Sequence, residues 1–155
     1  MNRPQQTPAR STVTIKYHPI HPMLVVFPVS FLLTTPLVDA VFWWTGNPFW
    51  AEVAFWLVAG GVFAGIGAAI VGLIDFVTVA EVRRHAASWS HMIVAMTLLA
   101  LAAGNLRLRW DDAADLFPWG FTLSVATAAL VMVAAWLGGT LTFRHRIGVY
   151  EHSTD

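Results

Sequence analysis

The sequence contains no cysteine and carries little charge of either sign. Without cysteine the chain can form no disulfide, thiolate zinc site, iron–sulfur cluster or covalently attached c-type haem. Charged residues make up 12% of the 155 residues, against about 25% in soluble domains. Nine Lys and Arg balance nine Asp and Glu, so no basic surface suggests a nucleic-acid partner. Because 57% of the residues are hydrophobic, the composition predicts a membrane protein.

Four apolar stretches are long enough to cross a lipid bilayer. The hydrocarbon core is about 30 Å thick and needs roughly 20 mostly apolar residues per helix. The stretches cover about residues 22–44, 50–76, 88–107 and 117–143, and none shows the alternation of barrel strands. The sequence therefore predicts an all-α membrane protein, an antiparallel four-helix bundle over residues 20–149. Polar tails are expected at residues 1–19 and 150–155.

Basic residues are distributed unevenly between the two ends of this predicted bundle. Cytoplasmic loops retain Lys and Arg. Arg107 and Arg109 fall at one end, whereas seven basic residues fall at the other: Arg3, Arg10, Lys16, Arg83, Arg84, Arg144 and Arg146. This distribution predicts that both termini are cytoplasmic.

Small residues recur at helical spacing in the second and fourth spans. Gly61, Gly65 and Gly72 lie on one face of the second span, and Gly138 lies on a similar face of the fourth. Membrane helices associate through close packing, which small side chains permit. We expect these glycines to line helix contacts, either within the bundle or against a second copy or another membrane protein. The lipid bilayer is the other expected partner.

Each span carries one ligand-type side chain near the same end of the bundle. His21 begins the first span, Asp75 ends the second, His91 begins the third and His145 ends the fourth. Imidazoles on facing helices are common ligands in bundle cores. These four residues are therefore candidate ligands for b-type haem or a first-row transition metal. The alternative is that water and lipid headgroups satisfy them at the helix ends.

Asp39 lies apart from these candidates, 18 residues after His21 and so about 27 Å further along the first helix. A charged carboxylate inside a span costs about 2.5–3.5 kcal/mol on insertion scales. Asp39 is either a proton-relay or cation-binding residue, or a structural residue that snorkels to the outer interface or pairs with Arg107 or Arg109.

Several motifs occur together in this chain. They are His21-Pro22 with Phe27-Pro28, Asp39, Gly72-Leu73-Ile74-Asp75, Arg84-His85-Ala86 with His91, Trp136-Leu137-Gly138-Gly139, and Arg144-His145-Arg146-Ile147-Gly148-Val149. In these motifs the chain resembles a bacterial membrane-protein family, domain of unknown function 2231. The resemblance implies a compact four-helix integral membrane domain found in bacteria and brings no established activity. We expect the protein in the bacterial inner membrane.

Three functions remain open from the sequence. The first is a membrane protein that binds haem or metal through its histidines. The second is a structural or assembly subunit without chemistry of its own, and the third is a small proton-coupled carrier that uses Asp39 and Asp75. An enzyme is the least supported class, because the chain lacks the G-x-S-x-G, phosphate-loop, H-E-x-x-H and dinucleotide-binding signatures.

Overall fold

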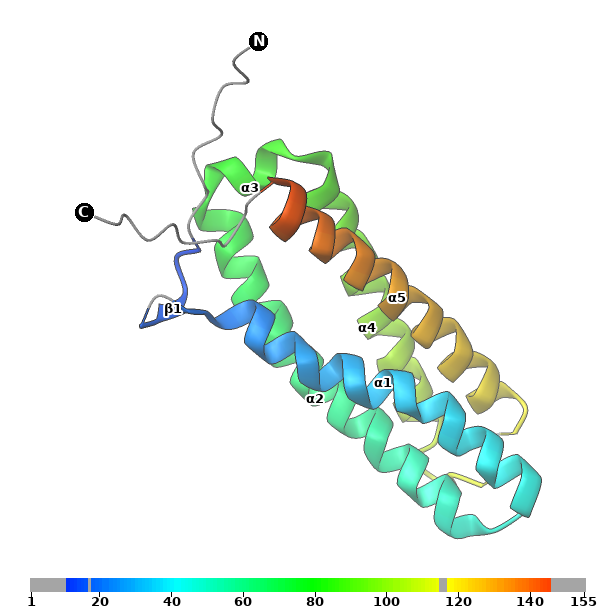
Figure 1. The fold of residues 1–155 in the computed structure, drawn as a ribbon. Coiled ribbons are helices and arrows are strands. Elements are labelled where there is room, and N and C mark those ends of the chain that lie inside the picture. Colours follow the sequence, from blue (N-terminus) through cyan, green and yellow to red (C-terminus); the bar gives the residue numbers. More distant parts are fainter. Residues whose placement is uncertain (1–10, 17, 115–116, 146–155) are drawn as a thin grey trace.

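A computed structural model describes residues 11–16, 18–114 and 117–145, without the side chain of His145. In this part of the chain almost all regular structure is helical (Figure 1). The elements in order are β1 (Thr14–Ile15), β2 (His18–Pro19), α1 (Ile20–Thr45), α2 (Pro48–Thr78), α3 (Ala80–Arg84), α4 (Ala86–Leu108) and α5 (Trp119–His145).

Four of these helices, α1, α2, α4 and α5, are long and apolar enough to cross a membrane. They overlap the four predicted spans, so the prediction of an all-α membrane bundle is confirmed. Large apolar side chains project outward, for example Phe63, which is 69% exposed, and Trp136, which is 79% exposed. Such side chains suit a surface that faces lipid.

The long helices form two antiparallel hairpins, α1–α2 and α4–α5 (Figure 1). Helix α1 also packs against α5, and α2 packs against α4. The order around the bundle is therefore α1, α2, α4, α5, and α1 and α4 are diagonally opposite each other. Because each begins an antiparallel hairpin at the same end, α1 and α4 run in the same direction. We call the end where α1 and α4 begin the histidine end, and the opposite end the arginine end.

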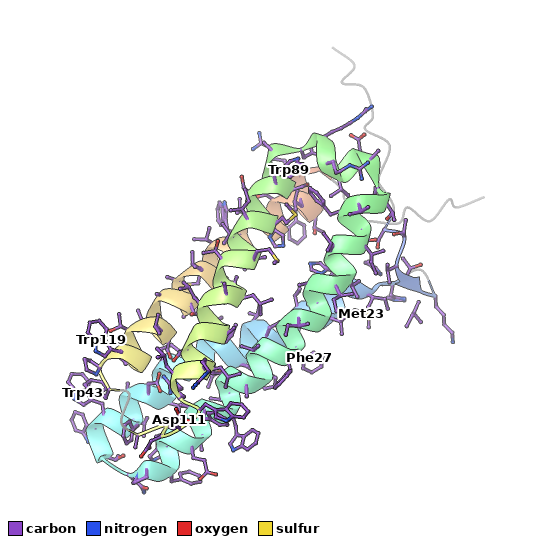
Figure 2. All side chains as sticks on the ribbon, turned by 180° about the vertical axis from the view of Figure 1, so that it is seen from behind. Met23, Phe27, Trp43, Trp89, Asp111 and Trp119 are labelled. Carbon is purple, nitrogen blue, oxygen red and sulfur yellow. The ribbon has the colours of Figure 1, made fainter. Side chains whose placement is uncertain are left out.

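Exposed tryptophans lie at both ends of the bundle. Figure 2 places Trp43 and Trp119 at the arginine end and Trp89 at the histidine end. All three side chains are exposed. Amphipathic indoles favour the boundary between lipid and water, so their positions are consistent with helices that span the bilayer.

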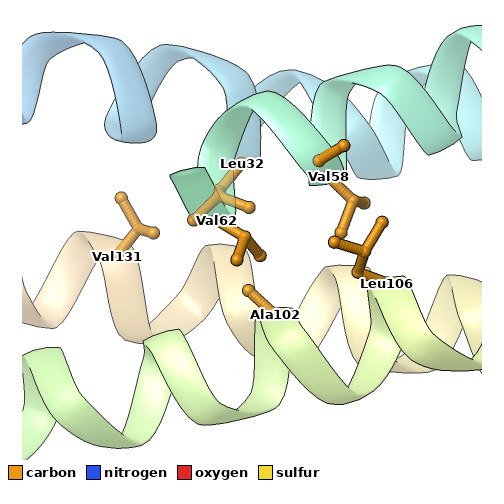
Figure 3. Close-up of a cluster of buried hydrophobic side chains, with 7 residues drawn as sticks. Leu32, Val58, Val62, Ala102, Leu106 and Val131 are labelled. Carbon is orange, nitrogen blue, oxygen red and sulfur yellow. The ribbon is translucent and has the colours of Figure 1, made fainter. Parts of the chain in front are cut away.

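The bundle core is a layer of aliphatic side chains between the two ends (Figure 3). Leu32 of α1, Val62 of α2, Ala102 of α4 and Val131 of α5 all take part in it. Leu32 reaches so close to α2 that a Cβ atom at Gly61 would lie 2.5 Å from its Cδ2 atom. Close approach of α1 and α2 at this level therefore requires glycine.

The turn between α1 and α2 follows from its four residues, Thr45-Gly46-Asn47-Pro48. Gly46 ends α1 in the left-handed conformation, with φ of 61°, and its N–H donates to the carbonyl of Phe42. The side chain of Asn47 accepts from the N–H of Phe49, and Pro48 occupies the first position of α2. Each residue type suits its place in a tight helix–helix turn.

Helix α3 connects the two hairpins. The guanidinium of Arg83 donates to the carbonyls of Phe76 and Val77 in the last turn of α2. The indole N–H of Trp89 donates to the carbonyl of Arg83 at 3.0 Å. These contacts satisfy carbonyls that the helix ends leave without intrahelical partners.

Candidate functional site

Two of the candidate ligands, His21 and His91, lie next to each other near the histidine end. His21 is the second residue of α1. His91 lies in the second turn of α4, the helix diagonally opposite α1. Their ring centres are 6.3 Å apart and the ring planes are perpendicular, at 90°. Helices α2 and α5 continue for about 15 Å beyond the level of this pair.

Each of the two rings is held by a carbonyl of the neighbouring helix. His21 Nδ1 lies 2.9 Å from the carbonyl oxygen of Ala68 in α2, and His91 Nδ1 lies 3.0 Å from that of Ala134 in α5. Because a carbonyl oxygen can only accept, each Nδ1 carries the proton and donates it. In a neutral imidazole the other nitrogen, Nε2, then has a free lone pair.

Two glycines allow the rings to reach these carbonyls. A Cβ atom at Gly72 would lie 2.8 Å from Cε1 and 2.9 Å from Nδ1 of His21. A Cβ atom at Gly138 would lie 3.3 Å from Cε1 of His91. Each glycine follows its acceptor alanine by four residues, so it lies directly beside the carbonyl that accepts from the imidazole.

Asp75 has a different set of partners. Its carboxylate accepts from the hydroxyl of Ser11 at 2.6 Å, from the N–H and the hydroxyl of Thr12, each at 2.9 Å, and from the N–H of Val13 at 3.3 Å. This carboxylate therefore ties the N-terminal segment to α2. The segment continues through the antiparallel strands β1 and β2 directly into α1.

Of the four candidate ligands, the structure brings His21 and His91 together. Within the described residues, no three His, Cys, Asp or Glu side chains come together as a metal-binding group. The side chain of His145, the fourth candidate ligand, lies outside the described residues. Gly61 and Gly65 lie deeper in the bundle, where Gly61 faces Leu32 and Gly65 faces Leu99.

At the arginine end, Asp39 of α1 and Arg109, which follows α4, form a bidentate ion pair. Arg109 Nη1 and Nη2 each lie 2.7 Å from an oxygen of Asp39, and both residues are only 3% exposed. Of the two interpretations of Asp39, the structure therefore shows the pairing. Arg107 is exposed instead and lies 3.5 Å from Asp111.

Two further polar side chains complete this network, and neither was among the predicted site residues. Arg109 Nε donates to Asn105 Oδ1 at 2.8 Å, and Nη2 also donates to the hydroxyl of Ser124 at 3.1 Å. Asn105 donates to the same hydroxyl at 3.0 Å. The four-residue spacing from Asn105 to Arg109 was the available sequence signal, since it places both on one helix face.

A small cavity borders the ion pair. Asp39 and Arg109 line it together with Phe42, Phe117 and Phe121, and its volume is about 10 Å³. A space of this size accommodates about one water molecule.

Four lipid-facing helices around a histidine pair and a buried ion pair define a small multi-pass integral membrane protein. The sequence profile of a family described as "predicted membrane protein (DUF2231)" matches residues 17–151. The chain belongs to this family, which confirms the resemblance of its motifs. No curated protein and no solved structure is significantly similar to the chain. The family description assigns no activity, so a function has to be argued from the two polar sites.

Proposed function

We propose that the protein binds a transition-metal centre between the Nε2 atoms of His21 and His91. The distance between the two rings carries the proposal. Metal–imidazole bonds of about 2.0–2.1 Å, with about 1.15 Å from each nitrogen to its ring centre, separate two opposed rings by about 6.3–6.5 Å. The two ring centres lie 6.3 Å apart.

The contacts of the other ring nitrogens support the same proposal. Imidazoles that ligate metals almost always donate their second N–H to a carboxylate, a carbonyl or water, which fixes the tautomer and the ring orientation. His21 and His91 make this contact through the carbonyls of Ala68 and Ala134. In a neutral imidazole the free lone pair is therefore on Nε2, the nitrogen that would bind the metal in each ring.

An opposed pair of imidazoles favours b-type haem over a bare ion. Tetrahedral zinc sites use three or four protein ligands, whereas His21 and His91 supply two. Haem iron takes most of its ligands from its porphyrin, so two protein imidazoles would complete its ligand set. A bound haem would supply one-electron chemistry, and His21 and His91 would hold it.

The test is a visible absorption spectrum of the detergent-purified protein, oxidised and dithionite-reduced, with elemental analysis of the same sample after expression with added haem. We expect a haem spectrum that is lost in His21→Ala and in His91→Ala. His18→Ala is the matched control, because His18 is exposed and its Nδ1 bonds the carbonyl of Lys16, in its own N-terminal segment. A bare first-row ion would show as stoichiometric metal without haem bands. A folded, colourless and metal-free protein would refute the proposal and favour an assembly role.

We also propose that the protein lies in the bacterial inner membrane with the histidine end facing the cytoplasm. Lys16, Arg83 and Arg84 are exposed at that end. At the arginine end, Arg109 is buried against Asp39, which leaves Arg107 as the exposed basic residue there among those described. This asymmetry supports the orientation that the positive-inside rule predicts.

The absence of native cysteine makes the orientation directly testable. A membrane-impermeant maleimide should label Asp112→Cys in spheroplasts, whereas Glu81→Cys should react only after the membrane is permeabilised. Both positions are exposed, so accessibility depends on the side of the membrane. The opposite labelling pattern would contradict the proposed orientation.

A further inference from the structure

The two helical hairpins make the same histidine contact at corresponding positions. His91 follows His21 by 70 residues, and Ala134 follows Ala68 by 66 residues. The bond from His21 to Ala68 is therefore repeated by the bond from His91 to Ala134, at 2.9 and 3.0 Å. Each acceptor alanine also begins the same motif, Ala-Ala-x-x-Gly, in α2 and in α5.

The same two offsets relate most of the buried positions of the hairpins. An offset of 70 relates α1 to α4, and the buried residues Leu32, Thr35 and Asp39 correspond to the buried residues Ala102, Asn105 and Arg109. An offset of 66 relates α2 to α5, and the buried residues Ala54, Val58 and Val62 correspond to the buried residues Gly120, Ser124 and Ala128. The hairpins therefore face each other with equivalent surfaces.

These correspondences define a pseudo-twofold axis that runs along the bundle. Helix α4 occupies the place of α1 on the opposite side and runs in the same direction, as α5 does for α2. His21 and His91 are equivalent positions, and so are Asp39 and Arg109. In a twofold arrangement, a contact between two residues that the axis relates to each other lies on that axis. The His21–His91 and Asp39–Arg109 pairs are both such contacts.

We propose that Asp39 and Arg109 act as a positioning pair that keeps α1 and α4 in the register in which His21 and His91 are opposed. Each member of the pair follows its histidine by 18 residues, so sliding of one helix along the other at the ion pair shifts the rings, about 27 Å away, by the same amount. A bidentate contact between a guanidinium and a carboxylate specifies geometry. Buried polar pairs can fix the register of packed helices, whose apolar contacts alone specify register less strictly.

The experiment measures the axial register by pulsed electron spin resonance between nitroxide labels. Two label pairs correspond under the pseudo-twofold axis: Met23→Cys with Arg107→Cys, and Ile93→Cys with Leu37→Cys. All four positions are exposed, and the chain has no native cysteine that would be labelled. Each pair joins α1 to α4 at different heights, so sliding of one helix along the other lengthens one distance and shortens the other.

In the unmodified background we expect two similar, narrow distance distributions. Asp39→Asn and Arg109→Gln should each make the two distances diverge on the scale of the helical rise, about 1.5 Å per residue of sliding, or broaden both. The exchange variant D39R/R109D should restore them, because the two positions are equivalent. Asp111→Asn removes an exposed charge at the same end and should leave both distances unchanged. If a single variant does not fold, the double variant D39N/R109Q replaces it, because that variant buries no unpaired charge. Its two label distances are interpreted in the same way.

The positioning role would be overturned if Asp39→Asn and Arg109→Gln kept the two label distances equal and their distributions narrow. It would also be overturned if the distance distributions of D39R/R109D were no narrower than those of the single variants. The consequence for the metal centre rests on the proposed function, and we expect Asp39→Asn to weaken haem binding as well. The spin-label distances need no bound metal, so the two proposals can fail separately. A metal-free protein whose register depends on Asp39 would refute the first and retain the second.

Discussion

Replacement of Gly72 by alanine tests whether the His21 ring is packed against α2. The added methyl group would lie 2.8 Å from Cε1 of His21, so the ring must move and its bond to Ala68 is disturbed. Overpacking typically costs about 1–3 kcal/mol, and loss of the hydrogen bond costs about 0.5–1.5 kcal/mol. The better helix propensity of alanine returns about 1 kcal/mol. We expect a net loss of about 0.5–3.5 kcal/mol in the free energy of unfolding.

Two other glycines are matched controls for this substitution. At Gly138 the nearest atom would be 3.3 Å away, and at Gly67 no atom lies within 4 Å. Gly138→Ala should therefore be nearly neutral, and Gly67→Ala should stabilise by up to about 1 kcal/mol. Reversible unfolding in mixed micelles titrated with dodecyl sulfate, followed by circular dichroism, measures all three. A Gly72→Ala protein as stable as Gly67→Ala would refute the packing of His21 on Gly72.

Two further predictions concern the charged residues. Arg109→Met leaves Asp39 buried without its counter-charge and should cost about 3–5 kcal/mol of stability. The double variant with Asp39→Leu should recover part of that loss in the same unfolding assay, whereas Arg107→Met, at an exposed ion pair, should cost less than about 1 kcal/mol. A double variant less stable than Arg109→Met would contradict this reasoning. Asp75→Ala removes the acceptor that holds the N-terminal segment, so trypsin should cleave after Lys16 faster than in the unmodified protein. Equal cleavage rates would show that Asp75 does not hold the segment.

The four helices were predictable because they depend on a local property, the length of each apolar stretch. The motifs around His21 and His91 likewise identified the family from the sequence alone. The pair of strands β1 and β2 was not predicted. Its position depends on Asp75, which lies more than 60 residues away from Ser11 and Thr12, and neither the length nor the composition of the tail indicates that contact.

The candidate site was predictable only in part, because the sequence shows which helix end a residue occupies but not which neighbour it faces. His21, Asp75, His91 and His145 all fall near one end of the bundle. The structure opposes His21 to His91, whereas Asp75 binds the N-terminal segment. The correspondence between the hairpins also stayed hidden in the sequence, since few of the equivalent residues are identical and the two offsets differ by four residues.

The pairing of Asp39 with Arg109 also sets an order of events during synthesis, because 70 residues separate the partners. At 5–20 residues per second, Asp39 is made roughly 4–14 s before its counter-charge. During that interval the first hairpin carries a carboxylate without its counter-charge, which costs free energy in lipid. Arrival of the second hairpin supplies the missing charge. The second half of the chain therefore completes the burial of Asp39, and we expect a nascent chain stalled before Arg109 to hold its first hairpin less stably in the membrane than the complete chain does.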